Sequence, residues 1–237
     1  MTVPVYLEVG ARRVFAGSLE WPGWVRSGRS EDQALDALAA AARRYAPVAA
    51  LAGLALPETD PGAPQGAGST PRGAPQGAGF EWTGLEVVER ISGNAATDFG
   101  VPSAIAEADR RPLTGKQARR VADLVGACWT YLDRVVAAAP AELRKGPRGG
   151  GRDRDKMFAH VIAAEAAYAG KLGIRRRNLP PEEVGPGSAV RAALLGVLGA
   201  ASTGEPLIEK SWPPRYAARR IAWHVLDHAW EIEDRST

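Results

Sequence analysis

The segment RRIAWHVLDHAWEIEDR, at positions 219–235, decides how the end of this 237-residue chain folds. Its apolar residues recur at the spacing of one face of an α-helix, which turns by about 100° per residue. This apolar stripe is formed by Ala217, Ile221, Val225 and Ile232. His228 falls inside the stripe and His224 at its edge, so the sequence predicts a helix with two inward-facing histidines. Buried imidazole nitrogens cost free energy unless they are paired, so both histidines need partners.

The opposite face of the same helix is aromatic. It carries Tyr216, Trp223, Leu226 and Trp230. Single exposed apolar residues are normal, but a contiguous aromatic stripe is typical of a contact surface. We therefore expect this face to be covered by the N-terminal part of the chain or by a second subunit.

The only other histidine is His160, in the helical segment KMFAHVIAAEAAYAGKLG at 156–173. It lies on the flank of that segment's apolar stripe, beside alanines that allow a neighbouring helix to come close. Two imidazoles at positions i and i+4, with a third from a facing helix, suit Zn²⁺, Ni²⁺ or Fe²⁺. The alternative is that hydrogen bonds satisfy each histidine separately. Because all three histidines can face one another, we predict a divalent metal site at His160, His224 and His228.

The C-terminal half, 114–237, has the pattern of a four-helix bundle. Thr114 caps the first helix, Asp155 the second, Ser188 opens the third, and Pro213 and Pro214 set the first turn of the fourth. The helices are expected within 114–140, 156–173, 189–202 and from 214 to the end of the chain. One long connection, between the second and third helices, is compatible with a bundle.

The N-terminal part, 1–100, reads as a small α+β module, so the whole chain is expected to be α+β. Alternating apolar residues predict strands within 3–10 and 12–21, extended chain at 22–28 and a further strand at 84–92. We expect these strands to form a small antiparallel sheet. Ser30 and Gln33 predict a capping-box start for a helix that Pro47 ends or bends.

Two further segments complete the chain: a loop inside the N-terminal module and a linker between that module and the bundle. Residues from about 57 to 80 are rich in Gly, Ala, Pro and Gln, and GAPQGAG occurs at both 62–68 and 73–79. Such sequence cannot bury a core, so a disordered, dispensable loop is expected. Residues 101–113 are interpreted as a linker to the bundle.

The composition limits the classes of function. The formal net charge is +3 with both signs interspersed, which makes nucleic acid an unlikely partner. The single cysteine, Cys128, excludes a disulfide framework and reads as a small buried hydrophobic residue. Neither a signal peptide nor an apolar stretch of about 20 residues is present, so no membrane partner and a cytoplasmic location are expected.

The C-terminal part resembles the DinB-like (DNA-damage-inducible) four-helix metalloprotein superfamily. That family places one histidine on its second helix, as in FAHVIAAEAAYAGKLG, and an HxxxH motif on its fourth, as in WHVLDHAWEIEDR. His160, His224 and His228 match these positions. The resemblance implies a divalent metal and a thiol-dependent transferase or isomerase that uses mycothiol or bacillithiol as cosubstrate.

The N-terminal part, VYLEVG…FAGSLEWPGWVRSGRSEDQALDAL, resembles the HicB-like antitoxin domain over about 45 residues. In that domain a strand runs into Pro-Gly, then a short strand and a helix that opens Ser/Thr-x-x-Glu/Gln-Ala-Leu. The DNA-binding tail of those antitoxins is absent, and the helical segment takes its place. The resemblance therefore implies a small sheet module without assigning it a task.

Further candidates surround the predicted metal site. Glu231 could orient an imidazole, or it could be a solvated charge at the helix end. The loop LRKGPRGGGRDRDK, at 143–156, could contact an anionic substrate or thiol through Arg148, Arg152 and Arg154, or it could be a solvated loop.

Two classes of function follow from these features. Three protein ligands leave coordination positions open, which favours an enzyme acting on a small molecule or thiol. The alternative is a regulatory or protein-binding module with a structural or vestigial metal. A homodimer through the bundle fits either class.

Overall fold

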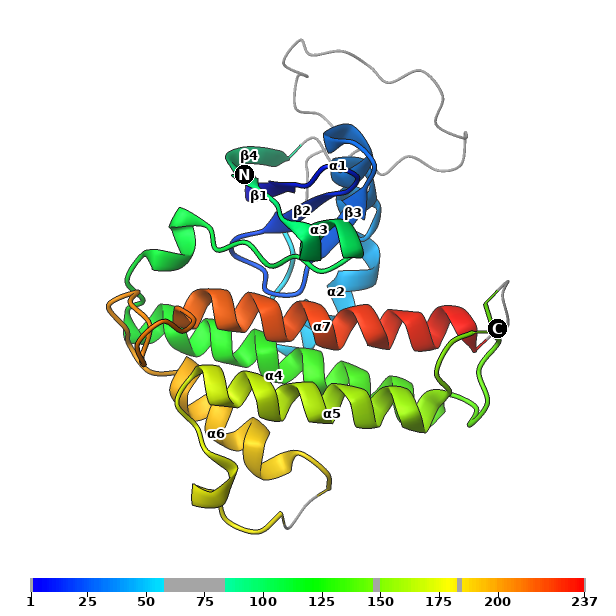
Figure 1. Cartoon of the computed structure of the whole chain (residues 1–237), viewed down its shortest axis with the longest axis vertical. Helices are drawn as coiled ribbons and strands as arrows, with labels where there is room; N and C mark the ends of the chain where they lie inside the picture. The colour runs from blue at the N-terminus through cyan, green and yellow to red at the C-terminus, as the bar shows by residue number, and fades with distance from the viewer. Residues whose placement is uncertain (1, 58–83, 147–149, 183–184, 237) are drawn as a thin grey trace.

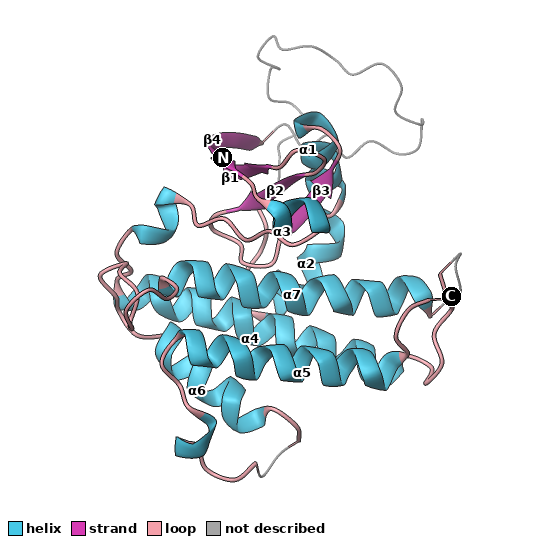
Figure 2. Ribbon diagram, viewed as in Figure 1, coloured by secondary structure: helices cyan, strands magenta, loops and turns pink. Residues whose placement is uncertain are grey.

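The structure, a computed structural model, describes residues 2–57, 84–146, 150–182 and 185–236 (Figure 1). It is an α+β fold in which a four-stranded N-terminal sheet lies on one side of a layer of long helices (Figure 2). Nearly all of the segment from about 57 to 80, expected to be disordered, lies outside the described residues. Among the helices that are described, none is long and apolar enough to cross a membrane.

The sheet contains β1 (Val3–Val9), β2 (Val14–Ser18), β3 (Val25–Gly28) and β4 (Leu85–Ser92), in the order β3-β2-β1-β4. The strands lie where the sequence predicts them. β1 pairs antiparallel with β2, and β2 with β3, as expected. β4 pairs parallel to β1, so the prediction of a wholly antiparallel sheet is wrong. The reason is the crossover: the chain passes through two helices before it returns to the sheet in the direction of β1.

The crossover helices are α1 (Glu31–Ala40) and α2 (Ala42–Leu51). The Ser30 side chain accepts a hydrogen bond from the Gln33 backbone N–H, as the capping box predicts. The break between the helices falls at Ala41, however, and Pro47 lies inside α2. A proline inside a helix removes one backbone hydrogen bond, and α2 is held in place by the buried side chains of Tyr45 and Val48.

Four longer helices form what we call the helical layer: α4 (Gly115–Ala138), α5 (Arg154–Lys171), α6 (Ser188–Leu198) and α7 (Pro214–Arg235). They occupy the predicted segments. α4 and α5 both pack against α7 and against α6. The Thr114–Gln117 capping box opens α4 as expected. The N-cap of α5 is Asp153, two residues before the predicted cap Asp155, so α5 begins at Arg154.

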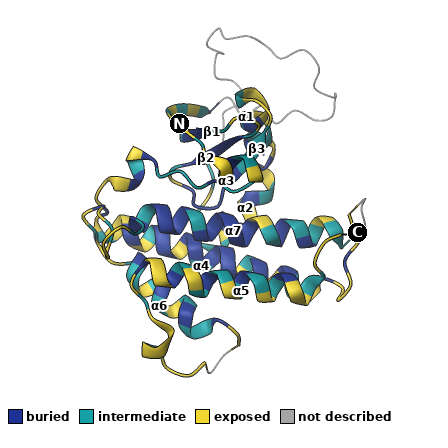
Figure 3. Ribbon diagram, in the orientation of Figure 1, coloured by how far each residue is buried: buried dark blue, intermediate teal, exposed yellow. Residues whose placement is uncertain are grey.

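The aromatic face of α7 is covered by the sheet module, which confirms the prediction that this face is a contact surface. Tyr216, Trp223, Leu226 and Trp230 are all buried. Figure 3 shows that much of α7 is coloured as buried. The Arg26 guanidinium of β3 lies 3.7 Å from the centroid of the Trp230 ring. Gly23, in the turn before β3, has a φ of +91°, and a Cβ there would lie 2.8 Å from a Leu226 methyl carbon. The turn therefore approaches α7 as closely as only glycine allows.

Short elements lie between the sheet and the helical layer. They are α3 (Ala95–Phe99) and a 3₁₀ helix at Glu107–Arg110. Within the segment interpreted as a linker, Asp109 is buried and accepts a hydrogen bond from Arg219 Nε at 2.8 Å. A further 3₁₀ turn, Arg176–Asn178, follows α5.

Candidate metal centre

The three histidines converge between α5 and α7. His160 comes from α5, and His224 and His228 lie one turn apart on α7. One nitrogen from each ring can be chosen so that all three lie within 4.8 Å of one another. The Nε2 atoms of His160 and His224 are 3.3 Å apart. As predicted, the histidine side chains point inward, come from two facing helices and converge on one point.

The spacing fits a metal ion. Two nitrogens bound at ordinary Zn–N distances to one tetrahedral zinc lie about 3.3 Å apart, which is the separation of the His160 and His224 nitrogens. A direct hydrogen bond between these two rings is the alternative. It would not account for the third ring, His228, which packs against both, with centroids 5.0 Å from His160 and 4.6 Å from His224, and bonds to Glu231 through Nδ1 alone. The donor set is therefore suited to a divalent metal.

The surroundings favour the neutral form of His160 and His224. His224 is buried, and burial, followed by the charges of His228 and Arg220, lowers its pKa to about 2. Burial is also the main reason that the pKa of His160 is lowered, and the charge of His228 adds to it. Neutral imidazole is the form that binds a metal, so no proton has to be displaced from these rings at neutral pH.

His228 is oriented by a carboxylate. Glu231 Oε2 lies 3.3 Å from His228 Nδ1, and Glu231 Oε1 accepts a hydrogen bond from Arg235 Nη1 at 2.8 Å. The hydrogen bonds from His228 and then Arg235 lower the pKa of Glu231. Metal-bound histidines typically donate their second nitrogen to such a carboxylate, which leaves Nε2 for the metal. The sequence places Glu231 on the flank of His224, whereas the structure brings it to His228.

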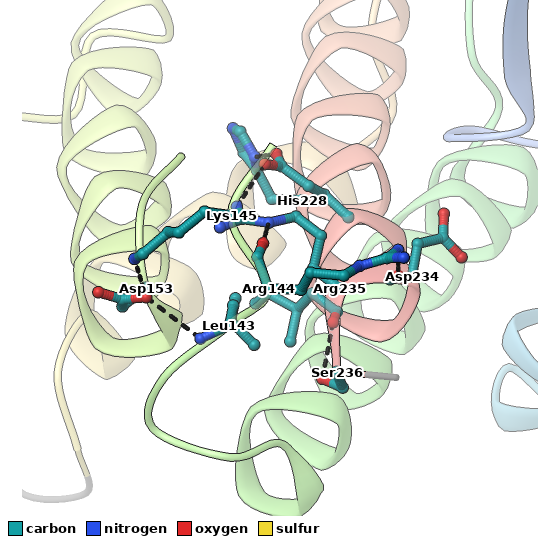
Figure 4. Close-up of polar contacts among 10 residues, drawn as sticks. Leu143, Arg144, Lys145, Asp153, His228, Asp234, Arg235 and Ser236 are labelled. Carbon is teal, nitrogen blue, oxygen red and sulfur yellow. Dashed lines mark hydrogen bonds and ion pairs between the residues drawn. The ribbon is translucent and has the colours of Figure 1, made fainter. Parts of the chain in front are cut away.

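Arg235 connects this carboxylate to the loop before α5 (Figure 4). Its Nε donates to the carbonyl oxygen of Arg144 at 2.8 Å, and the Arg144 backbone N–H donates to the Arg235 carbonyl at 2.9 Å. Asp153 closes the loop by accepting hydrogen bonds from Lys145 and from the Leu143 backbone N–H. Arg235 is not among the predicted site residues, although its position four residues after Glu231 is a signal for an ion pair on one helix face.

The three arginines predicted to contact an anion are placed differently. Arg148 lies outside the described residues. Arg152 is exposed, and its charge contributes, after burial and the neighbouring histidines, to the lowered pKa of His160. Arg154 donates to the carbonyl oxygen of Ala139 and pairs with Asp155. Arg152 therefore acts on the histidines, and Arg154 ties the start of α5 to the end of α4.

Another arginine lies beside the histidines. Arg220 precedes His224 by one turn of α7, and its guanidinium carbon lies 4.5 Å from the Trp223 ring centroid and 5.4 Å from that of Tyr168. The Tyr168 ring, from α5, in turn meets the His224 ring with centroids 5.7 Å apart. Arg220 and His224 are four residues apart on one helix, so the helical period of the sequence is sufficient to predict that they are neighbours.

The comparisons with known proteins do not extend this description. No model of a known protein family, no curated protein and no solved structure matches the chain. The function is therefore argued from the fold and the histidine cluster alone.

Proposed function

We propose that the chain is a DinB-like metalloprotein that binds a divalent zinc, nickel or iron ion through His160, His224 and His228. In this proposal it is a transferase or isomerase that uses a low-molecular-weight thiol, such as mycothiol or bacillithiol, or water as nucleophile. The observation that carries the proposal is the convergence of the chain's three histidines, from two helices, on one point. The packing of α4 to α7 as a helical layer supports the comparison with the DinB-like bundle.

Each residue around the histidines has a separate role in such a site. Three histidine ligands leave coordination positions open, and a bound divalent metal lowers the pKa of a water or thiol that occupies one of them. Glu231 fixes the tautomer of His228. Tyr168 and Trp223 cover the ring of His224 and reduce its contact with water. Arg152 adds positive charge, which favours an anionic thiol or substrate.

Elemental analysis of protein purified without a histidine tag tests the metal. We expect one equivalent in the wild type, none in a triple His→Ala variant and a strong loss in His224→Ala. Cys128→Ala is the matched control, because cysteine is also a metal-binding residue type but Cys128 lies outside the histidine cluster. Equal metal content in the triple variant and the wild type would contradict the proposal.

Cobalt substitution tests the open position. A thiol added to the Co²⁺ protein should produce a thiolate-to-cobalt charge-transfer band, because the thiolate becomes a ligand. If the metal is bound but the spectrum does not respond to thiol or to water exchange, the site is structural, and the protein-binding alternative replaces the enzyme.

A further inference from the structure

Two buried hydrogen-bond donors beside the histidine cluster have no acceptor. Arg220 makes no hydrogen bond or ion pair with any described residue, and its Nη1 is buried. His224 Nδ1, one helical turn further along α7, is also buried and without a hydrogen-bond partner. Buried polar atoms are normally paired, because an unpaired one loses its hydrogen bonds to water and gains none in the protein. Two such atoms on one helix face therefore indicate a ligand group that supplies the missing acceptors.

The other arginines of α7 all have at least one oxygen acceptor, although Nη2 of Arg235 is also buried without a partner. Arg219 is paired with Asp109, Arg215 donates to the carbonyl oxygens of Arg111 and Pro112, and Arg235 is held by Glu231. Each has an oxygen acceptor within the chain. Arg220 instead lies beside two ring faces, and the charge of Asp227 acts on it without a hydrogen bond or ion pair between them.

The two imidazoles of α7 also differ in whether Nδ1 has a hydrogen-bond partner. His228 donates its Nδ1–H to Glu231. His224 directs Nε2 toward His160, so its Nδ1 is the nitrogen left for an outer partner, and no described carboxylate reaches it. Asp227 is the acidic residue closest in sequence to His224; its charge interacts with that of Arg220, but it forms no hydrogen bond or ion pair with Arg220 or His224.

The walls around these donors are aromatic. The Arg220 guanidinium lies between Trp223 and Tyr168, and the Tyr168 ring packs against Trp212 with centroids 5.3 Å apart. Arg220 as a whole is partly exposed, so a ligand reaches the guanidinium from solvent through a rotation of this long side chain. Flat aromatic faces beside a cationic fork suit a planar, apolar body that carries an anionic group.

We propose that Arg220 and His224 Nδ1 receive the carboxylate of a small substrate whose body is planar and apolar. A carboxylate offers acceptors only, and its two oxygens match a guanidinium N–H on one side and an imidazole N–H on the other. Its negative charge supplies the direct ion pair that Arg220 does not make with any described carboxylate, Asp227 included. This inference deepens the proposed function and rests on it in one respect: binding of a metal at His224 Nε2 fixes the proton on Nδ1.

Calorimetric titration of the full chain with benzoate tests the proposal, with benzamide as the neutral analogue of the same shape. We expect saturable benzoate binding, weakened at least about tenfold for benzamide and in Arg220→Met. Arg215→Met is the matched control: it removes the same charge from the same helix and should leave benzoate affinity within about twofold. Zinc stoichiometry and thermal unfolding of each variant show whether it is folded.

The outcomes of this experiment distinguish failure of the carboxylate site from failure of the metal site. Equal binding of benzoate and benzamide, equal benzoate affinity in Arg220→Met and wild type, or no saturation at concentrations on the order of 10 mM overturns the carboxylate site. If Arg220→Met does not fold, Arg220→Lys, which keeps the charge but not the planar fork, should bind benzoate more weakly than the wild type, and unchanged affinity overturns the site. Benzoate binding that depends on Arg220 in chelator-treated protein upholds the carboxylate site even if zinc fails to bind.

Discussion

The ring of Phe15 in β2 meets the ring of Trp223 in α7 edge to face, with ring centroids 6.3 Å apart. Both side chains are buried, and Val25 of β3 completes the small cluster. Trp223 directly precedes His224, so the sheet module packs against the same turn of helix that carries a predicted metal ligand. The sheet is thereby part of the scaffold that positions the histidines.

Phe15→Ala should lower the free energy of unfolding by about 3–5 kcal/mol, because it leaves a cavity against Trp223 and Val25. Urea unfolding measures the change. Phe99→Ala is the control, since that ring is 86% exposed, and it should shift stability by no more than about 0.5 kcal/mol. Similar effects of the two substitutions would mean that Phe15 is not part of the core.

Asp109→Asn should be more destabilising than its conservative chemistry suggests. Asp109 and Arg219 form a buried ion pair, so removing the carboxylate charge leaves a buried guanidinium without its counter-ion, at a cost of about 3–5 kcal/mol. Asp133→Asn removes a carboxylate that is half exposed and should cost no more than about 1 kcal/mol. Thermal unfolding of both variants compares them. An Asp109→Asn protein as stable as the wild type would show that the pair is dispensable.

Cys128 should be inert toward thiol reagents in the folded protein. It is fully buried in α4, and burial raises the pKa of its thiol far above the ordinary range. Since the thiolate is the reactive form, Ellman's reagent should label one thiol per chain only after denaturation. Rapid labelling under native conditions would contradict the burial of Cys128 and would reopen its role in thiol chemistry.

The sequence predicts what depends on periodicity within one helix. The 3.6-residue repeat places His224 and His228 on the inner face of α7 and Trp223 on the outer face, and both placements agree with the structure. The position of β4 was also predictable, because its apolar residues alternate. These features are local, so each segment carries its own signal.

Long-range pairing is what the sequence does not specify. The direction of β4 depends on where the chain travels between β3 and β4, which no alternation within β4 encodes. The partner of Glu231 depends on rotamers, and the contact of Arg235 with the Arg144 carbonyl depends on a loop that is far away in sequence. A helical wheel shows the face a residue occupies but not the neighbour that meets it.

Glu231→Ala should weaken zinc binding about 10- to 100-fold, because His228 loses the acceptor that holds its tautomer. Competition with a chromogenic chelator measures the affinity. Glu233→Ala removes a carboxylate from the same helix that bonds to Arg44 and Tyr131 instead of a histidine, and its zinc affinity should stay within about threefold of the wild type. If both variants lose affinity equally, the effect belongs to the charge of the helix and not to His228.

Two adjacent glycines test whether the loop before α5 supports this carboxylate. Gly151 has a φ of +117°, and a Cβ there would lie 2.7 Å from Nη2 of Arg235, the side chain that holds Glu231. Gly151→Ala should therefore cost about 1–3 kcal/mol of stability and weaken zinc binding, because it strains the backbone and displaces the guanidinium.

Gly150→Ala provides the matched comparison in the same loop. Its φ lies outside the left-handed region, and no heavy atom lies within 4 Å of an added Cβ, so stability should change by no more than about 0.5 kcal/mol. The two alanine variants differ in backbone strain and in whether the new methyl group reaches Arg235. Thermal unfolding and zinc competition on both measure the difference. A loss of zinc affinity in Gly151→Ala but not in Gly150→Ala would show that this loop helps to position His228 through Arg235 and Glu231. Equal zinc affinities would show that residues of α7 alone position His228.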